Sequence, residues 1–128
     1  MKKKIIMVGS AAIVMIFAAI LFFSQPKKIV DTGYDIGQVT YKGNTITDQV
    51  DCEKLASIVS NYTCSRLPHT FSSYQTSQVV VELNGSDGDK PLHILLGEIN
   101  VAYESANQGG YTIHNSNALL RDILNVIQ

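Results

Sequence analysis

Basic residues are scarce after the first 28 positions of this 128-residue chain. From Ile29 onward there are five basic and eleven acidic residues, so this part carries a net charge of −6, whereas the whole chain carries −1. Proteins that bind nucleic acid through phosphate contacts need a basic face, so that class is excluded. The length of the chain also limits the number of domains that it can form. About 100 residues follow the N-terminal apolar run, which is enough for one small domain and too few for a multidomain enzyme.

Motifs of common catalytic and metal sites are missing as well. No Ser stands in a Gly-x-Ser-x-Gly elbow, and no glycine-rich loop ends in the Lys-Ser/Thr pair that holds a phosphate. The histidines His69, His93 and His114 lack the i, i+4 spacing of a helical metal site and do not alternate on one strand. We therefore expect no catalytic residues, no metal ligands and no cofactor, and we expect that the protein is not an enzyme. A small hydrolase is the remote alternative.

One long apolar run, Ile5 to Phe23, does stand out, with lysines on both sides. As a helix, its 19 residues would span roughly 28 Å, close to the hydrocarbon thickness of a bilayer. A cleaved signal peptide has a shorter apolar core and a small-x-small cleavage site, which the end of this run fits poorly. No Cys follows until Cys52, so nothing is placed for lipidation. The favoured interpretation is an uncleaved transmembrane anchor over residues 5–24, behind a cytoplasmic basic tip at 1–4.

The lysine distribution bears on orientation. Three lysines precede the apolar run and two follow it, which by the positive-inside rule favours a cytoplasmic N terminus and a C-terminal domain outside the cell membrane. Scarce lysine, many Ser, Thr, Asn and Gln residues, and an even number of cysteines agree with export. The expected location is therefore a single-pass protein in the cell membrane, with secretion after signal cleavage as the alternative.

Apolar periodicity predicts the domain organisation. Residues 25–37 read as a linker, because Pro26 cannot continue a helix and Asp and Gly residues follow, and the ordered domain then covers 38–128. In chain order we expect a hairpin over 39–47 turning at Gly43-Asn44, a helix from Thr47 or Asp48 to about Ser60, strands at 78–83, 92–96, 99–103 and 111–113, and a final helix from Asn115 or Ser116. The fold class is α+β: an antiparallel sheet of about four to six strands with two amphipathic helices, preceded by one N-terminal transmembrane helix.

The closing part of the chain carries a resemblance. A Gly-Gly-Tyr-x-Ile strand at Gly109 to Ile113 and an Asn-Ser-Asn-x-Leu-Leu helix from Asn115 follow the earlier helix, polar segment and strands. This order resembles small, largely uncharacterised membrane-anchored ectodomains of Gram-positive bacteria, over residues 38–128. The resemblance implies the fold and a bacterial, extracytoplasmic location, and it implies no catalytic residues.

Cys52 and Cys64 leave two interpretations open. In an exported domain they could form a disulfide, which requires their Cα atoms to approach to about 5.5 Å. The helix would therefore have to end near Val59 or Ser60 so that the chain doubles back. Otherwise they are two small buried thiols.

Residues 65–77 have weak periodicity and are the best candidate for a binding segment. Arg66, His69, Phe71 and Tyr74 are large side chains in polar surroundings, and arginine and aromatic residues dominate interface hot spots. Alternatively, Phe71 and Tyr74 pack onto the sheet as minor core residues, or the segment is an edge strand open to a partner chain.

These patterns favour a membrane-anchored extracytoplasmic interaction protein without catalytic activity. Its membrane contact would run through residues 5–23, and its −6 charge would attract a protein or cationic peptide partner. A concrete version is a self-immunity protein that captures a cationic antimicrobial peptide. The alternative is an accessory subunit of a membrane complex for secretion or envelope assembly.

Overall fold

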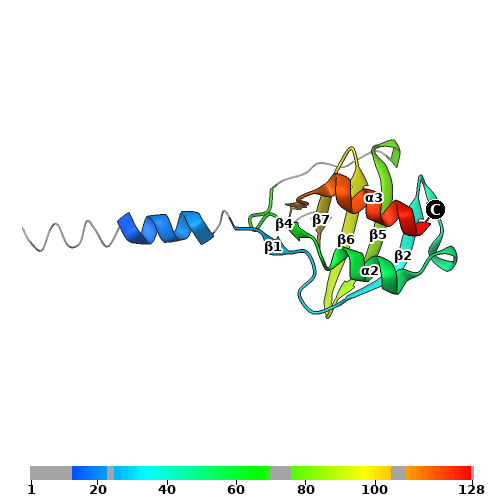
Figure 1. Ribbon diagram of the computed structural model, residues 1–128, viewed down its shortest axis with the longest axis horizontal. Helices are drawn as coiled ribbons and strands as arrows, with labels where there is room; N and C mark the ends of the chain where they lie inside the picture. The colour runs from blue at the N-terminus through cyan, green and yellow to red at the C-terminus, as the bar shows by residue number, and fades with distance from the viewer. Residues whose placement is uncertain (1–12, 23–24, 70–75, 105–108, 128) are drawn as a thin grey trace, which may run out of the picture.

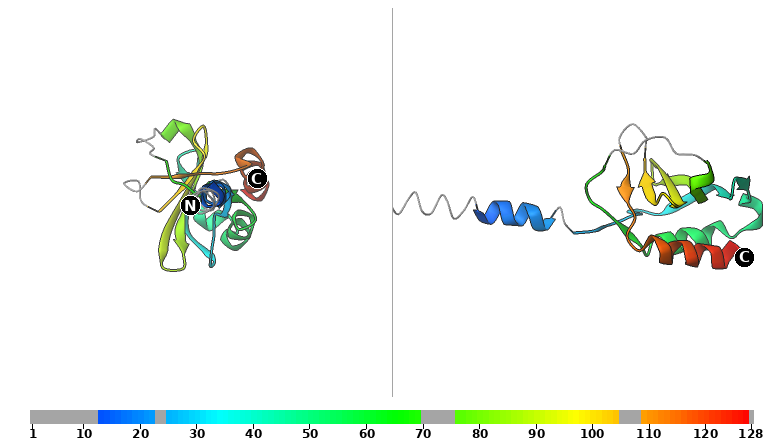
Figure 2. Two further views of the ribbon diagram at one scale, coloured as in Figure 1. Left: turned by 90° about the vertical axis from the view of Figure 1, so that its left-hand side faces the viewer. Right: turned by 90° about the horizontal axis from the view of Figure 1, so that it is seen from above.

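The computed structural model describes residues 13–22, 25–69, 76–104 and 109–127. It has the α+β architecture expected from the sequence, with two helices on one face of an antiparallel sheet (Figures 1 and 2). The sheet has six strands, which agrees with the expected four to six. A second sheet of two strands ties the N-terminal segment to the domain.

The six-stranded sheet has the order β3-β2-β5-β6-β7-β8, and every neighbouring pair is antiparallel. Most neighbours are also consecutive in the chain. The only long connection runs from β3 through a helix to β5, among the described strands. The strands are β1 (Lys27–Lys28), β2 (Tyr34–Tyr41), β3 (Asn44–Thr45), β4 (Thr63–Cys64), β5 (Val79–Asp87), β6 (Lys90–Gly97), β7 (Val101–Tyr103) and β8 (Tyr111–Thr112).

The central pair β5 and β6 supplies the middle of the core. Val81 lies opposite Leu96 and Leu83 opposite Ile94, and all four side chains are fully buried, as the alternation predicted. Val79 was expected on the same face. A β-bulge between Val79 and Val81 shifts the register, so Val79 instead packs with Leu95 and Val101 in a small cluster away from the main core.

The β2–β3 hairpin turns one residue earlier than predicted. Tyr41 pairs with Asn44, which makes Lys42 and Gly43 the two turn residues, with φ values of 50° and 83°. Two positive φ angles are the signature of a tight hairpin turn. The expected Gly43-Asn44 turn is wrong because both Gly and Asn tolerate such angles, so the sequence alone does not separate the two registers.

Both predicted helices are present. α2 (Cys52–Val59) is shorter than expected, because the 3₁₀ turn η1 (Thr47–Gln49) takes up its predicted start. Asp51 caps α2, and its side chain accepts a hydrogen bond from the backbone N–H of Lys54 at 3.2 Å. α3 (Ser116–Ile127) closes the fold, with Leu119 and Ile123 fully buried. A further 3₁₀ turn, η2 (Thr76–Gln78), leads into β5.

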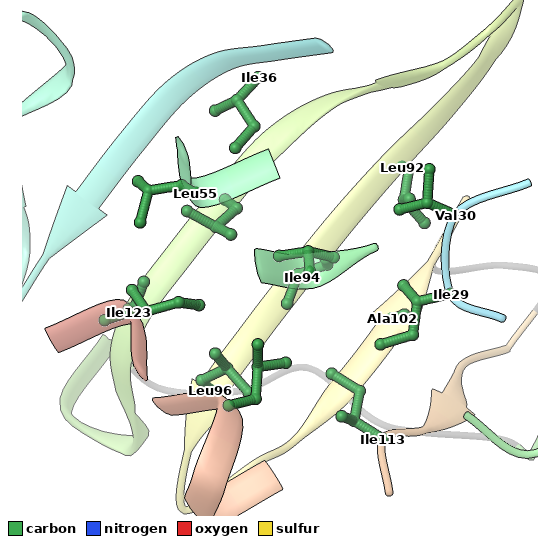
Figure 3. Packing of buried hydrophobic residues seen from close by; sticks show 14 of the residues in the cluster. Ile29, Val30, Ile36, Leu55, Leu92, Ile94, Leu96, Ala102, Ile113 and Ile123 are labelled. Carbon is green, nitrogen blue, oxygen red and sulfur yellow. The ribbon is translucent and has the colours of Figure 1, made fainter. Parts of the chain in front are cut away.

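The expected linker at 25–37 is largely part of the fold. β1 pairs with β4, β2 already begins at Tyr34, and the side chains of Ile29 and Val30 are buried among Leu92, Ala102 and other core residues (Figure 3). The sequence concealed this role because two adjacent apolar residues show no period. Their burial depends on the pairing of β1 with residues 35 and 37 positions further along the chain.

Residues 13–22 form a helix that extends away from the domain (Figures 1 and 2). All ten of its side chains are exposed. Across the described parts of the chain, we find no helix with both the length and the apolar character required to cross a bilayer. Positions 1–12 and 23–24, which belong to the predicted basic tip and anchor, lie outside the described residues.

Candidate functional site

The segment singled out from the sequence begins along the outer edge of β8. Cys64 lies opposite Ile113, and the backbone N–H of Ser65 donates to the Thr112 carbonyl at 2.8 Å. His69 and Gly110 exchange two backbone hydrogen bonds, both of 2.9 Å. The chain after β4 therefore extends the sheet past β8 and covers that edge.

β1 pairs with β4, so the N-terminal segment enters the domain at this same place. Lys27 lies opposite Cys64 and Lys28 opposite Thr63. We call this region the β1 end of the domain. It comprises the exposed or half-buried residues Lys27, Lys28, Arg66, Leu67, His69 and Tyr111.

Arg66 is half-buried and lies where the domain meets the N-terminal helix. Its guanidinium carbon is 4.3 Å from the centroid of the Phe22 ring, which is a close cation–π distance. Its Nε atom is buried and has no hydrogen-bond partner within the described parts of the chain. A guanidinium has five N–H donors, and the one on this buried Nε is out of reach of a ligand in solution.

His69 is held in place by its backbone, and its side chain is exposed. Its Nδ1 atom lies 3.4 Å from the Thr112 hydroxyl. The other two candidate binding residues, Phe71 and Tyr74, lie outside the described residues. The structure therefore places Arg66 and His69 at one end of the domain and does not test the second half of the predicted binding segment.

A second cation–π pair stands at the β1 end. The Lys27 ammonium lies 3.4 Å from the centroid of the Tyr111 ring, and Lys28 is exposed beside it. Behind the two lysines is a cavity of about 40 Å³, whose wall includes Ile29, Cys64, Leu92 and Ala102. This volume accommodates a few water molecules and is far below the size of a typical small-molecule site.

The two cysteines are free thiols in the structure, so the predicted disulfide is not formed there. α2 does end at Val59, as the bridge required, but the chain does not return along the helix. It continues into β4, beyond the helix end opposite to Cys52 (Figure 1). The helix alone separates Cys52 from Val59 by about 10 Å. Burial raises the pKa of the Cys64 thiol, which disfavours the reactive thiolate.

The three histidines lie at separate places. His93, on β6, has its Nδ1 atom 2.7 Å from the Asn84 side-chain oxygen, and its ring lies 5.0 Å from that of Tyr103. His114 has its Nδ1 atom 3.3 Å from the Thr63 hydroxyl. Within the described ranges no three His, Cys, Asp or Glu residues form a cluster that could hold a metal ion.

Sequence reasoning missed one well-built polar site, the carboxylate of Asp87 at the end of β5. It accepts hydrogen bonds from the backbone N–H groups of Asp31, Thr32 and Gly33, at 2.7, 2.8 and 3.1 Å, and from the Thr32 hydroxyl at 2.7 Å. Partial burial would raise the pKa of Asp87, but these hydrogen bonds outweigh it and lower the pKa to about 2. Because its acceptor sites are occupied by this chain, we assign Asp87 a structural role.

Open grooves also cross the helical face. One of about 470 Å³ lies between α2 and α3, and its wall includes Lys54, Ile58, Tyr62 and Asn125. There the Tyr62 hydroxyl donates to the Asp122 carboxylate at 2.6 Å, which joins the two helices. These grooves are shallow. Among the described residues, no convergent set of charged groups lines the groove between α2 and α3.

We compared the chain with known proteins. No protein-family model, curated protein or solved structure matches it.

Proposed function

We propose that this protein is a membrane-anchored extracytoplasmic binding protein, in which the N-terminal helix is the tether and the domain contacts a partner. The observation that carries the proposal is the exposure of the helix. Its eight large apolar side chains between Ile13 and Phe22 are 51–72% exposed. Burying one such side chain contributes about 1.5–3 kcal/mol, so together they favour an apolar surrounding over water.

The connection between helix and domain supports this tether. Lys27 and Lys28 follow the apolar run after three residues, at the level where lysines favour the phospholipid headgroups. Because β1 belongs to the fold, few residues separate the helix from the domain. The domain would therefore lie close to the membrane, with its β1 end toward it (Figures 1 and 2).

Membrane integration and orientation are tested together in cells that produce the full chain with a C-terminal epitope. We expect the protein to remain in the membrane fraction after an alkaline wash, and the domain to be cleaved when intact spheroplasts are treated with protease. Release by the wash, or protection of the domain in intact spheroplasts, would contradict the proposal.

Charge supports a cationic partner. The carboxylates of Asp48, Asp51 and Glu53 are exposed around η1 and the start of α2, at the end of the domain opposite to β1 (Figure 1). Acidic surfaces accelerate the association of cationic ligands, and this effect weakens as salt screens the charges. A cationic antimicrobial peptide captured at the membrane surface, as in self-immunity, is the concrete version of this partner.

The binding test uses the full chain in neutral lipid vesicles and a cationic amphipathic peptide at low and high salt. We expect salt-sensitive binding that weakens when Asp48, Asp51 and Glu53 are changed to Asn, Asn and Gln. Asp89→Asn, which removes one exposed charge elsewhere, is the control. Absence of binding at low salt, or binding that salt does not affect, would rule out the electrostatic version.

The exposed helix also favours a second candidate function, an accessory subunit whose helix packs against another membrane protein. Replacing residues 5–23 with an unrelated membrane helix separates the two. If the helix is only a tether, the protein keeps its function after this exchange. If the helix packs against another membrane protein, the function is lost.

A further inference from the structure

Leu67 is a large apolar side chain that is exposed on the surface of the domain. It is 54% exposed, and every other exposed large apolar side chain of the described residues belongs to the N-terminal helix. It follows Arg66 directly and lies three positions after Cys64, which pairs with Lys27. The exposed apolar side chain is therefore at the β1 end, where the helix enters the domain.

The contact of Arg66 with the N-terminal helix shows where the β1 end lies along the axis of that helix. Its guanidinium stacks on Phe22, which is in the last turn of the apolar run Ile5 to Phe23. If that run lies in a bilayer, the ring of Phe22 reaches the boundary between hydrocarbon and headgroups, and the guanidinium beside it reaches the phosphates. Arginine binds phosphate through paired N–H donors. The Nε atom of Arg66 is buried, so the terminal nitrogens of its guanidinium would make this contact.

Two further cations and one aromatic ring lie at the same end. Lys28 is exposed, and Lys27 covers the face of Tyr111, a residue type that concentrates at membrane interfaces. The cavity behind these lysines is also lined by Lys90 and by the carboxylates of Asp31, Asp87 and Glu104. With Arg66 there are four cations and three carboxylates around this end, although the domain as a whole is acidic.

We propose that the β1 end of the domain is a membrane-docking surface for anionic phospholipid, in which Leu67 enters the interfacial layer while Arg66 and Lys28 contact the headgroup phosphates. This proposal rests on the membrane anchor proposed above. It adds that the domain is held against the bilayer in one orientation, with η1 and the start of α2 facing away from the membrane (Figure 1).

The sequence contains no Trp, so one introduced tryptophan is a unique fluorescent probe. The full chain carrying Leu67→Trp is reconstituted into vesicles of phosphatidylcholine with phosphatidylglycerol. We expect the introduced tryptophan to emit at a shorter wavelength than a tryptophan exposed to water. It should also be protected from quenching by acrylamide and be quenched by brominated lipid. Gln49→Trp, an exposed position in η1 at the far end, is the matched control and stays accessible to acrylamide.

The charged contacts are tested by adding Arg66→Gln to the Leu67→Trp chain. A basic residue near an anionic surface contributes a factor of about five in binding, so the ratio of docked to undocked domain decreases about fivefold. Arg121→Gln, which removes an exposed arginine on α3, leaves this ratio unchanged. Circular dichroism checks that each variant keeps its fold.

Each remaining outcome has a distinct meaning. If Leu67→Trp is as accessible as Gln49→Trp while the protein resists an alkaline wash, the anchor is correct and the docking surface is wrong. If protection is the same in vesicles of phosphatidylcholine alone, which is zwitterionic, the requirement for anionic phospholipid is wrong. If the wash removes the protein from the vesicles, the anchor itself is overturned, and the docking proposal with it.

Discussion

Among single residues, Asp87 is notable because its carboxylate accepts four hydrogen bonds from one short segment. Four donors from residues 31–33 meet its carboxylate, 54 to 56 positions away in the sequence. The contact fixes the segment between β1 and β2 against the turn that joins β5 to β6. Because the charged form accepts all four bonds, the stability of the protein depends on the ionisation of Asp87.

This dependence has a definite sign. The pKa of Asp87 is about 2 in the folded protein and 3.8 as its ordinary value, so Asp87 stabilises the fold above pH 4. The contribution, about 1–2 kcal/mol after allowance for solvent screening, is lost as the pH falls from about 4 to 2. We expect Asp87→Asn to lower the free energy of unfolding by this amount at pH 7, measured with urea.

The same measurement repeated near pH 2 should show a much smaller difference between Asp87→Asn and the unmodified protein. Asp89→Asn, at the exposed turn two residues away, serves as the control at both pH values. Equal destabilisation at pH 7 and pH 2 would show that the charge of Asp87 does not matter.

Gly85 occupies a position where β2 and β5 approach very closely. A Cβ atom there would overlap with the backbone carbonyl oxygen of Asp35 and lie 2.9 Å from both the Ile36 Cα and a ring carbon of Tyr34. We expect Gly85→Ala to cost at least about 2 kcal/mol in thermal or urea unfolding. Gly33→Ala is the matched control, because nothing lies within 4 Å of its added Cβ. A neutral Gly85→Ala variant would contradict this packing.

Among the elements, the short helix α2 depends on its cap. The eight residues of α2 make only two turns, so the unpaired N–H groups at its start are a large share of its hydrogen-bonding groups. We expect Asp51→Ala to lower the free energy of unfolding by about 1 kcal/mol, and Asp51→Asn to have little effect because Asn caps equally well. Asp48→Ala, at an exposed position just before the helix, should change stability by less than about 0.5 kcal/mol.

The elements also show how far the sequence predicts the fold. Alternation identified β5 and β6, and a helical stripe identified α3, because one face of each packs against the main core. Prediction failed where a local pattern had two equivalent readings or none. The β2–β3 turn is one case, and β1, with only two residues, is the other.

The candidate site was partly predictable for the same reason. Arg66 and His69 stood out as large side chains in polar surroundings, but their place beside β1 depends on pairings between distant segments. Nothing in the spacing of Asp31, Thr32 and Asp87 indicates the cluster of hydrogen bonds that joins them. The exposure of Leu67 likewise emerges only from the folded surface.

On the scale of the whole molecule, the ordered domain begins before β2, because Ile29 and Val30 are 7% and 5% exposed. We expect Ile29→Ala to lower the free energy of unfolding by about 2 kcal/mol or more, since it leaves a cavity in the main core. Gln25→Ala, at an exposed position before β1, should have no measurable effect. If urea unfolding of the full chain in detergent shows no effect of Ile29→Ala, residues 25–30 are the linker that the sequence suggested.

The position of β1 also determines how the protein would respond to mechanical force. A pull on the N-terminal helix acts first on the two residue pairs that join β1 to β4, then on the buried side chains of Ile29 and Val30, and next on the Asp87 hydrogen bonds. The six-stranded sheet comes last along this path. Tension between the membrane and a bound partner would thus detach the N-terminal segment in steps before the sheet unfolds.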